Sequence, residues 1–171
     1  MKNDINERLA AAIRQFQLPD YESIPDVGLY LEQTTRFVAE YLAPLPNIAI
    51  TSSMIGNYVK KGLIESPVKK MYSRDQIAYL LFIAVAKTVL SLEDIQMLIR
   101  LQKEAYAGKT AYEYFVREFT NVLHYVFGLK DTLDAVGRET SHEKTMLRNT
   151  IITVAHKIYL DMCFAAIHES E

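Results

Sequence analysis

Residues 50–63 read ITSSMIGNYVKKGL and contain a short helix together with its start and stop signals. Thr51 is of the type that caps a helix N-terminus, and Gly62 is of the type that ends a helix in a left-handed conformation. Between them lies Gly56, and a glycine inside a helix costs about 1 kcal/mol relative to alanine. Two explanations fit: Gly56 allows tight packing within the chain, or it lets another molecule approach the helix closely.

The helix predicted over residues 52–61 has two faces of different character. One face carries Ile55, Tyr58 and Val59, which we expect to point into the core. The residues at positions i, i+3, i+4 and i+7 of the opposite face are Ser53, Gly56, Asn57 and Lys60. Serine and asparagine hydrogen-bond base edges, and asparagine pairs favourably with adenine. The spacing predicts a polar face that suits the major groove of DNA.

A basic segment follows this helix. Residues 63–64 and 71–72 are expected to pair across a turn built on Ser66-Pro67, which gives one short β-hairpin. Between residues 51 and 75 basic residues exceed acidic ones by three, although the whole chain has a net charge of -2. The basic residues are Lys60, Lys61, Lys69, Lys70 and Arg74. We expect Lys61, Lys69, Lys70 and Arg74 to hold DNA phosphates, while solvated surface lysines would give the same composition.

The rest of the chain has the pattern of helices. Asp26 is a candidate cap for a helix that prolines stop after Leu42. Ser73 with Gln76 has the capping-box pattern, and Ser91 opens the next helix. Apolar periodicity predicts two further helices over residues 110–127 and 142–167. The expected fold is mainly α, with one short hairpin and additional C-terminal helices.

The domain organisation has two readings. Residues 1–104 would form an N-terminal helix with the helix-turn-helix region, and residues 105–171 a C-terminal helical region for dimerisation or effector binding; both parts could also form one compact domain. The last helix has an apolar stripe wide enough to cover the domain and meet a second copy. We expect a homodimer through the C-terminal helices. A buried helix in a monomer is the alternative.

Several classes of site lack their sequence signals. The single cysteine, Cys163, lies among apolar residues, and the four histidines are scattered. No glycine-rich phosphate loop, nucleophile elbow or His-Glu-x-x-His motif is present, so we expect no enzyme, no metal and no cofactor. The aromatic residues between 106 and 127 follow a helical spacing, which is typical of a core; a hydrophobic effector site is the alternative.

Localisation is also predicted from composition. Half of the residues are apolar and 23% are charged, as in ordinary globular proteins. The N-terminus has no signal-peptide pattern, and the apolar window at residues 77–86 is far shorter than the roughly 20 residues that span a bilayer. We expect a cytoplasmic protein without a membrane segment.

The run from Ile50 through Ile99 resembles the winged helix-turn-helix of MerR-type regulators. A capped helix with a Gly-Leu stop leads into a wing, then a tyrosine and a second capped helix, then a further helix start. The matching positions are Tyr58, Gly62, Leu63, Tyr72, Ser73, Leu92 and Ile95. The resemblance extends over roughly residues 29–101. It implies a DNA-binding fold in which residues 52–61 form the recognition helix.

With SIPDVGLYLEQTTRFVAEYL at residues 23–42, the chain more closely resembles the YkrK-like family of small bacterial proteins, a domain of unknown function. That resemblance implies a transcriptional regulator and supplies no operator or effector. MerR-type proteins usually have Arg-Tyr where this chain has Gly56-Asn57, and their wing is longer than ESPVKK at residues 65–70. Double-stranded DNA is therefore the expected partner. The rivals are a protein-interaction module that has lost DNA binding and a small-molecule sensor.

Overall fold

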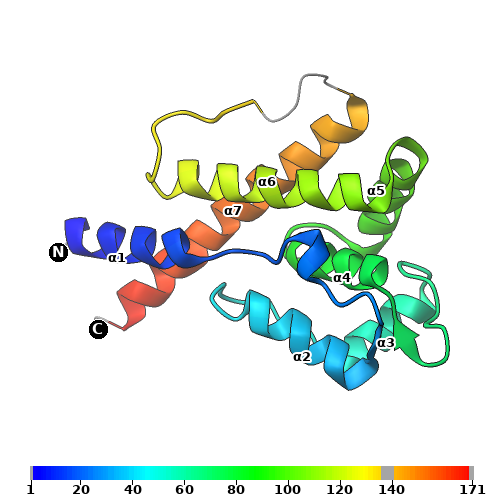
Figure 1. Ribbon diagram of the computed structural model, residues 1–171. Coiled ribbons are helices and arrows are strands. Elements are labelled where there is room, and N and C mark those ends of the chain that lie inside the picture. Colours follow the sequence, from blue (N-terminus) through cyan, green and yellow to red (C-terminus); the bar gives the residue numbers. More distant parts are fainter. Residues whose placement is uncertain (1, 136–140, 170–171) are drawn as a thin grey trace.

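The computed structural model describes residues 2–135 and 141–169, with side chains from residue 4 onward. These residues form a mainly helical protein with one small antiparallel sheet (Figure 1). The elements are α1 (Lys2–Gln15), the 3-10 turn η1 (Tyr21–Ser23), β1 (Leu29–Tyr30), α2 (Leu31–Leu42), α3 (Ser52–Lys60), β2 (Met71–Tyr72), α4 (Arg74–Ala86), α5 (Leu92–Ala105), α6 (Gly108–Val126) and α7 (His142–His168).

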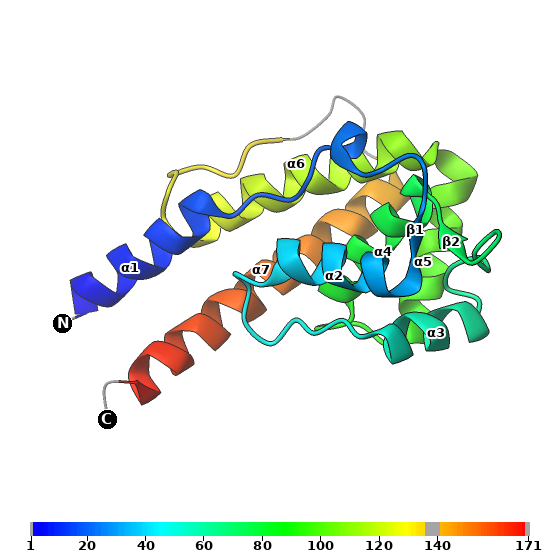
Figure 2. The ribbon, with the colours of Figure 1, turned by 60° about the horizontal axis from the view of Figure 1, so that its bottom comes forward.

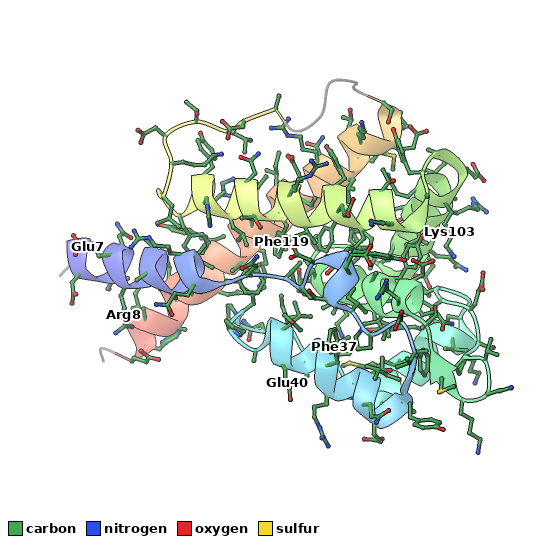
Figure 3. The ribbon with its side chains drawn as sticks, viewed as in Figure 1. Glu7, Arg8, Phe37, Glu40, Lys103 and Phe119 are labelled. Carbon is green, nitrogen blue, oxygen red and sulfur yellow. The ribbon has the colours of Figure 1, made fainter. Side chains whose placement is uncertain are left out.

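Helix α4 lies at the centre of the fold. Of its residues from Ile77 to Ala86, only Tyr79 is not buried. A helix that is apolar on all sides must be covered on all sides. Helix α2 packs against one side of α4, and α6 and α7 pack against the other (Figure 2). Phe119 of α6 points into this core, whereas Glu7 and Glu40 lie at the surface (Figure 3). One hydrophobic core therefore includes residues from both 1–104 and 105–171.

Helix α7 is the longest helix of the described residues. Its 27 residues make it the one helix there that is long and apolar enough to cross a membrane, by length and composition only. The first half of α7 packs against neighbouring helices, chiefly α6, and buries Leu147, Ile151 and Val154 there. Packing in the core accounts for the apolar character of this part of α7.

The start and stop signals of α3 are confirmed. The Thr51 side chain accepts a hydrogen bond from the backbone N–H of Met54 at 3.1 Å. Gly62 has a φ of 76°, and the N–H of Leu63 donates to the carbonyl of Tyr58 at 2.9 Å. This is the Schellman arrangement, which satisfies carbonyls left open at the helix end. The Ser73–Gln76 capping box is also present.

Two expected local structures are wrong. Helix α2 begins at Leu31 rather than after Asp26, and the N–H of Tyr30 donates to the Gln33 side chain at its start. The segment at residues 63–64 does not pair with β2; β2 pairs with β1 instead, with Leu29 opposite Tyr72. Leu63 is buried at the end of α3, where its backbone completes the helix stop. Because the backbone N–H of Leu63 donates to the helix, it does not pair with a strand.

A carboxylate lies buried between α6 and α7. The Glu118 side chain is fully buried, and its Oε1 is 2.9 Å from Nε of Arg148. Burial raises the pKa of Glu118 above its ordinary value, and the positive charge of Arg148 opposes that shift. The folded state therefore holds the Glu118 proton more tightly than the unfolded chain does.

Alanine substitutions at Gly56 in α3 and at Gly62 just after it should change the stability of the protein in opposite directions. Gly62→Ala forces a side chain into a left-handed backbone and should destabilise the protein by about 1 kcal/mol. Gly56→Ala should stabilise it by up to about 1 kcal/mol, because φ is ordinary and a Cβ at position 56 meets nothing within 4 Å. Urea unfolding of both variants measures the difference. Equal effects of the two substitutions would contradict this assignment.

Glu118 gives a prediction about pH. Because its pKa is raised on folding, its contribution to stability should fall as pH rises from about 4.5, its ordinary value, through the folded pKa. Glu118→Gln removes this titration while keeping the shape of the side chain. Unfolding free energies of both proteins between acid and neutral pH should show the wild type losing stability relative to the variant. A difference that is constant with pH would refute it.

Candidate nucleic-acid interface

Helix α3 presents its polar face to solvent. Ile55 and Tyr58 are 0% and 2% exposed, so the apolar face lies in the core as expected. The residues of the opposite face are all exposed: Ser53, Gly56, Asn57 and Lys60. Lys61, which follows the helix, is exposed as well. The described part of the chain leaves this face open to another molecule.

Gly56 does not serve packing within the chain. A Cβ built at this position has no heavy atom within 4 Å, so the space above it is open. Of the two explanations for this glycine, tight packing against another helix therefore finds no support among the described residues. A close approach by a second molecule stays a prediction.

Side chains from two neighbouring helices, α2 and α5, hold α3 in place. The Ser52 hydroxyl donates to Glu32 Oε1 at 3.0 Å, and its oxygen lies 2.9 Å from Thr35 Oγ1 on α2. At the other end, the Gln96 amide of α5 donates to the carbonyls of Lys61 and Gly62 at 3.2 and 3.3 Å. These bonds fix α3 although the connection before it, residues 43–51, is long.

Lys87 supports α3 from below its apolar face. The Lys87 ammonium lies 6.0 Å from the centre of the Tyr58 ring and 3.3 Å from the Met54 sulfur. Burial lowers the pKa of Lys87 and raises that of Tyr58. Lys87 is half-buried and Tyr58 is 2% exposed, so Tyr58 belongs to the core and not to the exposed face.

Lys69 and Lys70 form the tip of a tight turn. Val68 and Met71 exchange two backbone hydrogen bonds, of 3.1 and 2.9 Å, around the two lysines. The φ angles of Lys69 and Lys70 are 49° and 66°, the left-handed region that normally favours glycine or asparagine. Left-handed conformations cost ordinary residues roughly 1 kcal/mol each. The turn holds two exposed ammonium groups together in spite of this cost.

Arg74 opens α4 as expected, but its side chain has partners within the chain that the sequence did not predict. Its Nε donates to the carbonyl of Ile24 at 2.7 Å, its guanidinium pairs with Glu22 at 3.0 Å, and it lies 5.3 Å from the Tyr21 ring centre. Lys109 pairs with the same carboxylate of Glu22. Arg74 thus anchors the segment before β1 to the start of α4, and its charge is already engaged. The interface is built without it.

Exposed apolar side chains next to the lysine turn were not expected from the sequence. Val27, Val68 and Tyr30 are 78%, 73% and 55% exposed. No periodic pattern in the sequence predicts their exposure, because Val27 lies in a bend, Tyr30 in a two-residue strand and Val68 beside the lysine turn. The surface beside Lys69 and Lys70 is therefore partly apolar.

The aromatic residues of α6 mainly fill the core. Tyr112, Phe115 and Phe119 are 5% exposed or less, and the Phe115 and Phe119 rings stack at 5.6 Å. Tyr114 is half-buried, and Tyr125 is 41% exposed. In the described ranges, no group of three or more His, Cys, Asp or Glu residues could hold a metal ion. The one Glu-x-x-His spacing of the sequence, from Glu139 to His142, includes a residue outside those ranges.

The molecule is thus a mainly helical protein with an exposed polar helix beside a basic turn. A family model, described as Domain of unknown function (DUF1836), matches residues 19–115, which is more than half of the chain. The protein belongs to this family. The match includes β1, α2, α3, the lysine turn and the central helix α4. Neither the curated proteins nor the solved structures gave a match.

Proposed function

We propose that the protein is a non-enzymatic, DNA-binding transcriptional regulator of the cytoplasm, with α3 as its recognition helix. The observation that carries the proposal is the open polar face of α3, on which Gly56 leaves unfilled space between Ser53, Asn57 and Lys60. A backbone without a side chain lets the helix lie close to sugar or base edges. The resemblance of the sequence around the cap, helix stop and basic turn to MerR-type regulators supports the same function.

Each part of this surface has a role in the proposal. Asn57 and Ser53 read base edges in the major groove, where asparagine pairs with adenine. Lys60, Lys61, Lys69 and Lys70 contact phosphates and set the position of the protein on the duplex. The acidic remainder of the chain, with a total net charge of -2, limits binding to unrelated sequences.

Two variants with changes on α3 and the lysine turn test DNA binding. A genomic fragment selected from a random pool serves as the probe. Lys60→Glu combined with Lys69→Glu should abolish binding, because phosphate contacts supply most of the affinity. Gly56→Leu should also abolish it, because its side chain fills the open space while the fold has room for it. The logarithm of the wild-type affinity should fall linearly with the logarithm of the salt concentration, with a slope of about -0.9 for each phosphate contact.

The matched control reverses the same number of charges elsewhere. Arg14 on α1 and Arg117 on α6 are exposed, and their double exchange for glutamate changes the net charge equally. This variant should bind the fragment within about threefold of the wild type. If the control loses binding as fully as the Lys60 and Lys69 variant, or if Gly56→Leu binds normally, α3 is not the recognition helix.

A second candidate function is a protein-interaction module on the same surface. The observation that favours it is the exposure of Val27, Tyr30 and Val68 beside the lysine turn, because apolar patches mark protein contacts. Under this candidate no fragment is retained from the pool. Val68→Asp, rather than Gly56→Leu, then abolishes the regulatory effect in cells.

We also propose that two copies associate through the C-terminal end of α7. Leu160, Phe164 and Ile167 are 50%, 57% and 47% exposed, and their spacing of four and three residues places them on one side of the helix. Such a stripe is typical of a helix that packs against a partner helix. A two-fold dimer would present two α3 helices to separated half-sites.

Phe164→Asp tests the dimer. The substitution places a charge in the proposed contact and leaves the core unchanged, because Phe164 does not belong to the buried set. Light scattering during size-exclusion chromatography should report a dimer for the wild type and the mass of one chain for the variant. Ala165→Asp adds the same charge at the next, equally exposed position but on a different side of the helix; it is the control and should remain dimeric. A wild-type monomer at high concentration rules out this contact.

A further inference from the structure

Helices α5 and α7 carry half of the large apolar side chains that the described residues expose. These four of eight are Met97, Leu160, Phe164 and Ile167, and the last three form the α7 stripe. The C-terminal turns of α7 extend past the ends of α2 and α6 (Figures 1 and 2), and from Tyr159 to His168 only Ala166 is buried. An exposed apolar surface of this kind marks a contact with another molecule.

An open apolar groove lies beside the other half of α7. It has a volume of about 390 Å³ and is bounded by α7, by α5 and by the connection between α4 and α5. A cavity of about 150 Å³ holds benzene, so the groove has room for an aromatic ring. The apolar side chains that line it are Val89, Leu90, Met97, Leu98 and Met146.

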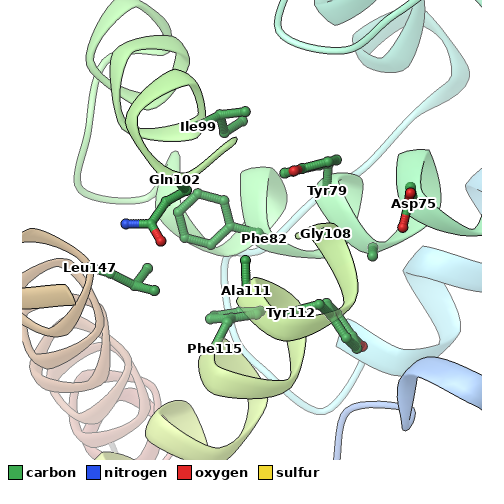
Figure 4. A pocket seen from close by; sticks show the side chains of 11 residues that line it. Asp75, Tyr79, Phe82, Ile99, Gln102, Gly108, Ala111, Tyr112, Phe115 and Leu147 are labelled. Carbon is green, nitrogen blue, oxygen red and sulfur yellow. The ribbon is translucent and has the colours of Figure 1, made fainter. Parts of the chain in front are cut away.

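The enclosed pocket between α4, α5, α6 and α7 is much smaller. Its volume is about 40 Å³, and Figure 4 shows the Phe82 side chain in the middle of the residues that line it. The Phe82 and Phe115 rings meet there, with 5.3 Å between their centres. An apolar side chain from another molecule therefore fits the groove and not this pocket.

The polar side chains of the groove are engaged within the chain. The Asn149 amide and the hydroxyls of Thr150 and Thr153 donate to carbonyls four residues earlier on α7, at 2.9, 2.9 and 2.8 Å. Asp94, which also lines the groove, accepts a hydrogen bond from the Ser91 hydroxyl at 2.8 Å. Because these donors point back to their own helix, the groove presents mainly methyl and methylene groups to a ligand.

The α7 stripe and the groove lie on the same side of α7. Successive residues of a helix are rotated by about 100°, so positions along α7 can be compared directly. On that basis the stripe and three residues of the groove share one sector of about 60°. These six residues are Met146, Asn149, Thr153, Leu160, Phe164 and Ile167. The groove occupies the N-terminal half of this face and the stripe its C-terminal half.

One symmetry operation brings each stripe onto a groove. When two α7 helices pack antiparallel about a two-fold axis beside residues 156 and 157, Phe164 of each copy lies opposite Asn149 of the other. In the same register Leu160 lies opposite Thr153. The two-fold axis repeats each contact, so both grooves are filled at once. A parallel pair would instead set stripe against stripe and leave both grooves open.

The polar centre of this face is compatible with such a crossing. His156 and Lys157 lie next to the axis, and the Lys157 ammonium pairs with Asp161 of its own helix at 2.6 Å. The carboxylate therefore balances the charge that the second copy meets. The antiparallel direction also places the N-terminus of each α7 beside the C-terminus of the other, where their opposite partial charges attract.

From this geometry we infer that the groove between α5 and α7 binds Phe164 of a second copy of this chain, with the two α7 helices antiparallel. The inference rests on the proposed association of two copies and adds the receptor surface, the direction and the register. It is independent of DNA binding by α3.

Met97→Asp tests the groove. Met97 lies on α5, so a dimer that α7 stripes form alone would not change. In the inferred dimer the substitution puts a carboxylate into both grooves and should raise the dissociation constant about a hundredfold, tenfold for each groove. Sedimentation equilibrium measures this constant. Tyr125→Asp is the matched control: Tyr125 is 41% exposed against 46% for Met97, and it lines neither groove nor stripe, so this variant should remain dimeric.

A mixture of two monomeric variants tests the pairing itself. The Phe164→Asp chain keeps its groove, and the Met97→Asp chain keeps Phe164. A dimer of one chain of each kind has one intact contact, whereas each variant alone has none. The mixture should therefore form dimers at concentrations at which both separate variants are monomeric. Native mass spectrometry identifies the mixed species, and thermal unfolding confirms that each variant is folded.

Cross-linking tests the direction of the helices. In a Cys163→Ala background, Lys157→Cys places a thiol beside the axis, and a short thiol cross-linker should join the two copies. Asn149→Cys should not be joined, because the two copies of residue 149 lie about 22 Å apart along the helices in the antiparallel register. A parallel pair would be joined at both positions.

Each contrary outcome has a distinct meaning. If Met97→Asp stays dimeric while Phe164→Asp is monomeric, the association stands and the groove is not its receptor. A mixture that stays monomeric would reject the contact between Phe164 and the groove. Efficient cross-linking through Asn149→Cys would reject the antiparallel direction. A wild-type chain that is monomeric at high concentration would overturn the proposed association and this inference together.

Discussion

The fold depends on the burial of helix α4 on every side. A helix with Leu80, Leu81 and Ile83 all fully buried can be stable only when other helices exclude water from its whole circumference. Helix α2 does this on one side and α6 with α7 on the other. Helix α3 then occupies the outer layer, held by α2 and by the Gln96 side chain of α5, so its polar face stays in solvent. The exposed surface proposed for DNA is thus a consequence of how the centre is packed.

The same arrangement separates two kinds of site. The polar face of α3 and the Lys69–Lys70 turn lie at the surface, where charge and exposure decide what they contact. An apolar pocket of about 40 Å³ beside Phe82 lies between α4, α5, α6 and α7, where shape decides what fits. The segment at Tyr21–Ser23 touches the second region, because Tyr21 bonds to Asp75 and Glu22 to Arg74. The N-terminal connection is therefore part of the structure around Asp75, which lines this pocket.

Signals carried by one or two neighbouring residues could be predicted from the sequence. The Thr51 cap, the Gly62 stop, the Ser73–Gln76 box and the start of α7 at His142 all rest on local backbone chemistry, and all are present. The partner of β2 could not be predicted, because a two-residue strand at Leu29–Tyr30 has no alternation to reveal it. The partners of Arg74 could not be predicted for a related reason: they lie at residues 22–24, about fifty residues away in the chain. The pocket depends on four helices at once and leaves no linear pattern.

The uniform burial of α4 also limits how this chain can change in length. Inserting or deleting one residue in a helix rotates everything beyond it by about 100°. In a helix with one buried face such a shift can be absorbed by repacking that face. In α4 it would misalign the contacts with α2, α6 and α7 together. Relatives that share this architecture should therefore keep α4 at constant length and place their insertions in connections such as residues 43–51 or 127–135.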